Sequence, residues 1–171
     1  MGKGIKLSIL GGILTIVGTY IFTWFSFVFV DTLYASGIGG IINSAEIIPH
    51  MGSLGRRYNL EPFEIYLWII FIYAFAACGA LQILAIKNYY IGLVGTIIAL
   101  IMGIMLFLGA ILGVVPFFLR YLELFGSDLI VEGAFPIHYV WFGKASLGCY
   151  LVFAGGIIGV IGAYFSREEY F

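Results

Sequence analysis

Residues 89–115 read YYIGLVGTIIALIMGIMLFLGAILGVV and contain no charged side chain. A helix needs about 20 apolar residues to cross the hydrocarbon core of a bilayer, so this run is long enough to span a membrane. Three further runs, residues 5–30, 63–86 and 145–166, are similarly apolar and carry charged side chains only near their ends. The pattern predicts four transmembrane helices.

The composition independently indicates a membrane protein. Hydrophobic residues make up 63% of the 171 residues, charged residues make up 10%, and the mean hydropathy is +1.11. Soluble globular domains have about 45–50% apolar and about 25% charged residues. Little chain is left outside the four runs, so we expect a single integral membrane domain over residues 1–171, in contact with the lipid bilayer. With a net charge of −1, no nucleic-acid partner is expected.

The charges that flank the first run predict the orientation. Four spans place both termini on the same side of the membrane. Lys3 and Lys6 precede the first run and Asp31 follows it, and basic residues beside a first span favour its cytoplasmic end. Counted together, the eight basic residues of the chain divide evenly, four on each predicted side of the membrane, and do not decide the orientation. We therefore predict a multi-pass protein of the plasma membrane with both termini in the cytoplasm.

Small residues recur at three- and four-residue steps in the predicted spans. Such stripes let helix backbones approach closely in lipid, where the hydrophobic effect does not drive helices together. The first and last runs could thus pack against each other at a left-handed crossing angle of about +20°. The same faces could instead bind another subunit. The candidate packing residues are Gly11, Gly18, Gly95, Gly103, Gly109, Gly113, Gly148, Gly155, Gly159 and Gly162.

Asp, Glu, Lys, Arg and His are absent from the interiors of the four runs. Proton relays, voltage sensors and many ion-coupled carriers depend on intramembrane charges, so proton-coupled transport is not expected. Gln82 is a polar exception, and it either hydrogen-bonds to another helix or reaches the membrane interface close to Lys87. Cys78 and Cys149 also fall inside runs, which favours small buried side chains over a disulfide framework.

Two long loops, residues 31–62 and 116–144, are unusually apolar for segments that face solvent. We expect them to fold against each other as a small extracellular cap. Residues 117–125 favour a short interfacial helix, and residues 128–135 and 137–142 favour short strands. The predicted fold is an all-α membrane protein, a four-transmembrane-helix bundle with a cap that contains short β-strands and an interfacial helix.

The two histidines of the chain, His50 and His138, lie in the two long loops. Glu46 precedes His50 by four residues, a spacing at which one helical turn could present a pair of metal ligands. The three residues lack a recognised metal-binding spacing, so the sequence favours structural or surface histidines over a metal site. We predict no cofactor and no catalytic residue.

A topological resemblance follows from the order of the segments. A short N-terminal stub, a long first loop, a tight turn at Lys87-Asn88 and a second long loop resemble the layout of claudin and tetraspanin membrane proteins. The resemblance covers the whole chain at the level of topology and implies four spans. The signature motifs of both families, including their loop cysteines, are absent from this sequence, so no functional residue is carried over.

These observations favour a noncatalytic structural or accessory subunit of a membrane protein complex. It would pack through its glycine-rich helix faces and apolar loops, against other membrane subunits or against itself. A homo-oligomeric channel or carrier for a small solute is the alternative. A second alternative is a membrane enzyme subunit with a quinone, lipid or metal site at the outer interface, formed by Glu46, His50, Glu132 or His138.

Overall fold

The computed structural model describes residues 2–28, 32–58, 60–109, 136–142 and 145–170. This part of the chain is mostly helical. Its helices are α1 (Lys3–Tyr20), α2 (Gly37–Tyr58), α3 (Pro62–Ile83), the short 3-10 helix η1 (Leu84–Ile86), α4 (Tyr89–Phe107) and α6 (Leu147–Tyr170). Its strands are β1 (Phe25–Val28), β2 (Thr32–Ala35), β3 (Val140–Phe142) and β4 (Ala145–Ser146).

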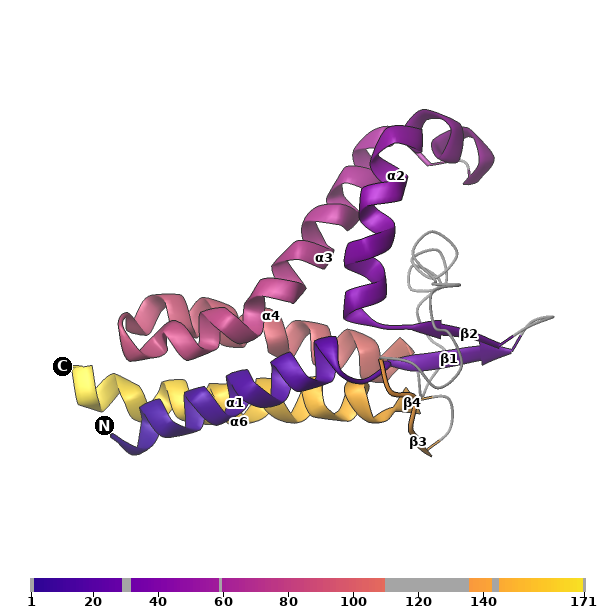
Figure 1. Cartoon of the computed structure of the whole chain (residues 1–171). Coiled ribbons are helices and arrows are strands. Elements are labelled where there is room, and N and C mark those ends of the chain that lie inside the picture. The colour runs from indigo at the N-terminus through magenta and orange to yellow at the C-terminus, as the bar shows by residue number, and fades with distance from the viewer. Residues whose placement is uncertain (1, 29–31, 59, 110–135, 143–144, 171) are drawn as a thin grey trace.

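Helix α1 lies along α6 and has its most extensive contacts with it (Figure 1). Helix α6 also packs against α4, and α3 packs against both α4 and α1. The two termini lie at the same end of these helices, because Gly4 contacts Ser166. The strands lie at the opposite end (Figure 1).

Three helices in the described part of the chain are long and apolar enough to cross a membrane. They cover Pro62–Ile86, Tyr89–Phe107 and Leu147–Arg167, which correspond to the second, third and fourth predicted runs. Helix α1 is not among them, because its two lysines and its glycines and threonines lower its mean hydropathy.

The prediction of one continuous helix over residues 5–30 was wrong. Helix α1 ends at Tyr20 and strand β1 begins at Phe25. The intervening and following residues are rich in aromatic and β-branched side chains, which favour extended backbone. Trp24 also stabilises the helix end, because its Nε1–H donates a hydrogen bond to the carbonyl oxygen of Gly18 at 3.0 Å. Carbonyls in the last turn of a helix have no partner within the helix.

A four-stranded antiparallel sheet joins the chain that follows α1 to the chain that precedes α6. The strand order is β2-β1-β4-β3. Phe25 of β1 lies opposite Ala35 of β2 on one side and opposite Ala145 of β4 on the other. The fourth run therefore begins as a strand, and its helix begins at Leu147 and not at residue 145.

Helix α2 occupies most of the first long loop, where no long helix was predicted. Ile47 and Met51 are buried, Ile41 and Leu54 are half-buried, and this face of α2 packs against α3. Pro49 lies inside the helix, and proline and glycine both disfavour helix interiors. The apolar contact with α3 therefore outweighs a poor intrinsic helix propensity.

The other cap elements are only partly within the described residues. The predicted interfacial helix at residues 117–125 and the predicted strand at 128–135 lie outside them. Strand β3 falls inside the predicted strand region of residues 137–142.

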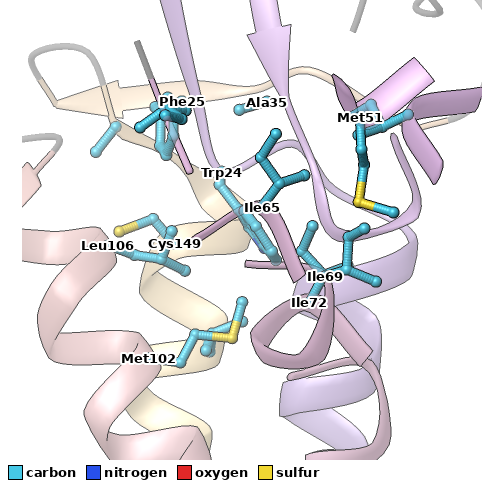
Figure 2. Packing of buried hydrophobic residues seen from close by; sticks show 14 residues of the cluster. Trp24, Phe25, Ala35, Met51, Ile65, Ile69, Ile72, Met102, Leu106 and Cys149 are labelled. Carbon is cyan, nitrogen blue, oxygen red and sulfur yellow. The ribbon is translucent and has the colours of Figure 1, made fainter. Parts of the chain in front are cut away.

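The apolar core lies where α2, α3 and the sheet meet. Trp24 is almost fully buried and packs beside Ile65, Ile69 and Ile72 of α3 (Figure 2). Met102 of α4 belongs to the same cluster. This core holds the sheet and α2 against the ends of the long helices.

Candidate functional site

Glycines of α1 lie directly against glycines of α6. A Cβ atom built on Gly11 would lie 2.7 Å from the carbonyl oxygen of Gly155, and one built on Gly18 would lie 2.8 Å from that of Gly148. Cβ atoms in proteins essentially never approach other heavy atoms to less than 3.0 Å. Larger residues at these positions would therefore push the two helices apart.

This contact extends along the whole of α1. Towards the termini, a Cβ atom on Gly162 would lie 2.6 Å from the backbone nitrogen of Ser8. Beyond it, Gly4 meets Ser166. The two backbones thus stay in close approach from one end of α1 to the other.

Helix α4 packs against its neighbouring helices through two other glycines. A Cβ atom on Gly95 would lie 2.8 Å from the carbonyl oxygen of Cys78 in α3, and one on Gly103 would lie 2.6 Å from the Cα of Phe153 in α6. Gly109 follows the end of α4 and is half-buried. Gly113 lies outside the described residues.

Two further glycine contacts were not singled out in the sequence. A Cβ atom on Gly12 would lie 2.7 Å from the carbonyl oxygen of Gly79, which brings α1 against α3. One on Gly156 would lie 2.7 Å from the Cα of Leu100, which brings α6 against α4. Both follow a glycine of the α1–α6 contact in sequence. Successive helical residues point about 100° apart, so adjacent glycines serve two different neighbouring helices.

A buried polar group of atoms lies between these helices. The amide of Gln82 in α3 is 0% exposed, and its Oε1 accepts a hydrogen bond from Thr15 Oγ1 of α1 at 3.2 Å. Thr15 Oγ1 also lies 2.9 Å from the carbonyl oxygen of Gly11, a second acceptor for its single hydrogen. Gln82 therefore bonds to another helix and does not reach the interface.

The other side of the Gln82 amide faces Gly159 and Thr96. A Cβ atom on Gly159 would lie 3.1 Å from Gln82 Nε2 and 3.0 Å from Thr96 Oγ1. Neither polar atom has a hydrogen-bond partner among the described residues. A Cβ atom at position 159 would therefore require one of these two side chains to shift by a few tenths of an ångström. Gly159 thus borders the buried polar group as well as α1.

His138 takes part in a chain of hydrogen bonds at the junction of the sheet and the helices. Its Nδ1 lies 2.7 Å from Thr23 Oγ1, which lies 2.8 Å from Ser146 Oγ. Ser146 Oγ lies 2.9 Å from the carbonyl oxygen of Tyr139. A carbonyl only accepts, so the Ser146 hydrogen points to Tyr139, the Thr23 hydrogen points to Ser146, and His138 Nδ1–H must be the donor to Thr23.

This chain gives His138 a structural role. It ties β4 and the residue before β3 to the segment that follows α1. Burial lowers the pKa of His138 below its ordinary value, because a charged imidazole would lose solvation there.

The metal-site candidates are not assembled into a metal centre in the part of the structure that is described. His50 is exposed on α2, and the side chain of Glu46 and all of Glu132 lie outside what is described. Among the described residues, no three His, Cys, Asp or Glu side chains gather closely enough to hold a metal ion.

No protein-family model, curated protein or solved structure matches this chain. The geometry of the described residues supports structural roles, namely close packing of the helices and attachment of the sheet to them.

Proposed function

We propose that this protein is a noncatalytic accessory subunit of a membrane protein complex. In this proposal it is a four-helix bundle that crosses the plasma membrane four times, with both termini in the cytoplasm. The supporting observation is that Gly11, Gly18, Gly95, Gly103, Gly148 and Gly155 all lie against other segments of the same chain, which leaves other helix faces for a partner.

The pairing of α1 with α6 supports the assignment of α1 as a membrane span in addition to the three candidate spans. Helix α6 is long and apolar enough to cross a membrane. Helix α1 contacts it from Gly4–Ser166 at one end to Gly18–Gly148 at the other. A helix that accompanies a span along its length crosses the same depth of the bilayer, although its own mean hydropathy is lower.

The first half of α3 is the surface that we assign to the partner. In this half of the helix, Tyr66, Leu67, Ile70 and Phe71 are all exposed. Neighbouring residues in a helix point in different directions, so this segment is apolar on several sides. Helix α2 covers only one of these sides. Aromatic residues are enriched at protein interfaces, which favours a protein partner there over lipid alone.

A pore through one copy of the chain is not favoured. A solute path between α1 and α6, or between α4 and its neighbours, would have to pass through the backbone contacts at Gly11, Gly18 and Gly103. This argument disfavours the channel alternative for a single protomer.

Native mass spectrometry of the protein extracted from its own membranes in mild detergent tests the proposal. We expect the wild-type protein to carry stoichiometric foreign subunits. The variant Ile70→Trp should lose these subunits, because the substitution adds bulk to the exposed face of α3. Ile101→Trp is the matched control, because Ile101 is exposed on α4, and it should keep the partner. A chain that is alone, or that forms only a homo-oligomer, would overturn the proposal.

A further inference from the structure

A cavity of about 250 Å³ lies at the turn between α2 and α3. It is lined by Gly52, Gly55, Arg56, Leu60, Glu61 and Pro62. Pockets for drug-sized ligands measure about 300–1,000 Å³, so this cavity suits one small polar group. Gly52 is exposed, and a side chain built on it would meet no atom within 4 Å.

Two opposite charges line this cavity. Arg56 uses its Nε–H to bond the carbonyl oxygen of Gly52 at 3.2 Å. Glu61 and Glu64 form a capping box at the start of α3, in which Glu64 Oε2 accepts from the Glu61 backbone N–H at 2.9 Å. Within the described residues, Arg56 and Glu61 form no ion pair with each other. The cavity therefore offers a cation and an anion at separate places.

The cavity lies at the beginning of a candidate span. Pro62 lines it and is also the first residue of the apolar stretch Pro62–Ile86. The end of a span lies at the level of the lipid headgroups. The highly exposed Phe63 follows directly and is placed to contact an acyl chain.

We propose that this cavity binds the headgroup of a zwitterionic phospholipid with a primary ammonium, such as phosphatidylethanolamine. The Arg56 guanidinium contacts the phosphate, because its planar donors match phosphate oxygens. The Glu61 carboxylate contacts the ammonium. An anionic lipid would satisfy Arg56 only and would bring negative charge towards Glu61. The inference requires α3 to span a membrane, and it does not require a partner subunit.

Native mass spectrometry of delipidated protein exchanged into equal amounts of phosphatidylethanolamine, phosphatidylcholine and phosphatidylglycerol tests this site. We expect selective retention of phosphatidylethanolamine. Arg56→Gln and Glu61→Gln should each lower it about tenfold, the loss expected for one charge-assisted hydrogen bond. Arg167→Gln, at an exposed arginine of α6, should leave it unchanged.

Three results would overturn the assignment. They are preferential retention of phosphatidylglycerol, unchanged retention in Arg56→Gln, and equal binding of soluble glycerophosphoethanolamine in place of the lipid. Equal melting temperatures of the wild type and the variants establish that all of them are folded. Absence of foreign subunits from a wild-type protein that retains phosphatidylethanolamine would count against the accessory function alone.

Discussion

Gly155 lies in a crowded part of the contact between α1 and α6. A Cβ atom there would lie 2.5 Å from Thr15 Oγ1, 2.7 Å from the carbonyl oxygen of Gly11 and 3.0 Å from the backbone nitrogen of Thr15. Two of these atoms belong to the backbone and cannot move without displacing α1. A side chain at this position therefore separates the helices.

We expect Gly155→Leu to destabilise the folded monomer. Overpacking costs about 1–3 kcal/mol and occasionally more, and the backbone contacts place this substitution at the upper end of that range. Thermal unfolding in detergent, followed by circular dichroism, measures the loss. Ile157→Leu, at an exposed position of the same helix, is the control. Equal melting temperatures for both variants would show that the close approach is not required.

Gln82 shows how much of a side chain's packing environment can be predicted from its residue type alone. Its amide required a partner at either of two places, the interface or another helix, and only the position of Thr15 decided between them. Gly12 and Gly79 were not singled out, because the helix that a glycine faces depends on which neighbours surround its own helix. Residue type indicates close packing, whereas the partner depends on the tertiary arrangement.

At the scale of elements, the sheet depends on the chain of hydrogen bonds through His138. Burial lowers the pKa of His138 in the folded protein. The unfolded chain then takes up a proton at about pH 6.5, where the folded protein does not. Stability is therefore constant well above this pH and falls as the pH decreases towards the folded pKa.

We expect the sheet to be less protected from amide hydrogen exchange at pH 5.5 than at pH 7.5, with a loss of at most about 1.4 kcal/mol per pH unit. His138→Asn should remove much of this dependence, because asparagine does not titrate. Exchange measured on the peptides that contain β1 and β4 provides the test. A variant with the same pH dependence as the wild type would mean that another group is responsible.

The apolar runs predicted some elements well and others poorly. Residues 63–86 correspond closely to α3 and η1, since a long uninterrupted run has few alternatives to a helix. Residues 21–28 were assigned to a helix because a short apolar run does not distinguish a helix from a buried strand. Strand β1 is determined by its pairing with Ala35 and Ala145, and the second of these is distant in sequence. Helix α2 was missed because Pro49 and several glycines argue against a helix, and its contact with α3 is tertiary.

At the scale of the whole molecule, the number of spans decides how the protein sits in a membrane. Composition identifies three candidate spans, and three spans would place the termini on opposite sides. The contact of Gly4 with Ser166 places the termini side by side. This contact supports the proposed topology of four spans, with α1 beside α6.

Thiol labelling of single cysteines in intact cells tests this topology most directly. The variants are Lys3→Cys, Arg167→Cys and Arg56→Cys, each in a Cys78→Ala/Cys149→Ala background. We expect a membrane-impermeant reagent to label position 56 in intact cells, and to label positions 3 and 167 only after permeabilisation. Labelling of position 3 or of position 167, but not both, in intact cells would place the termini on opposite sides and would contradict the four-span bundle.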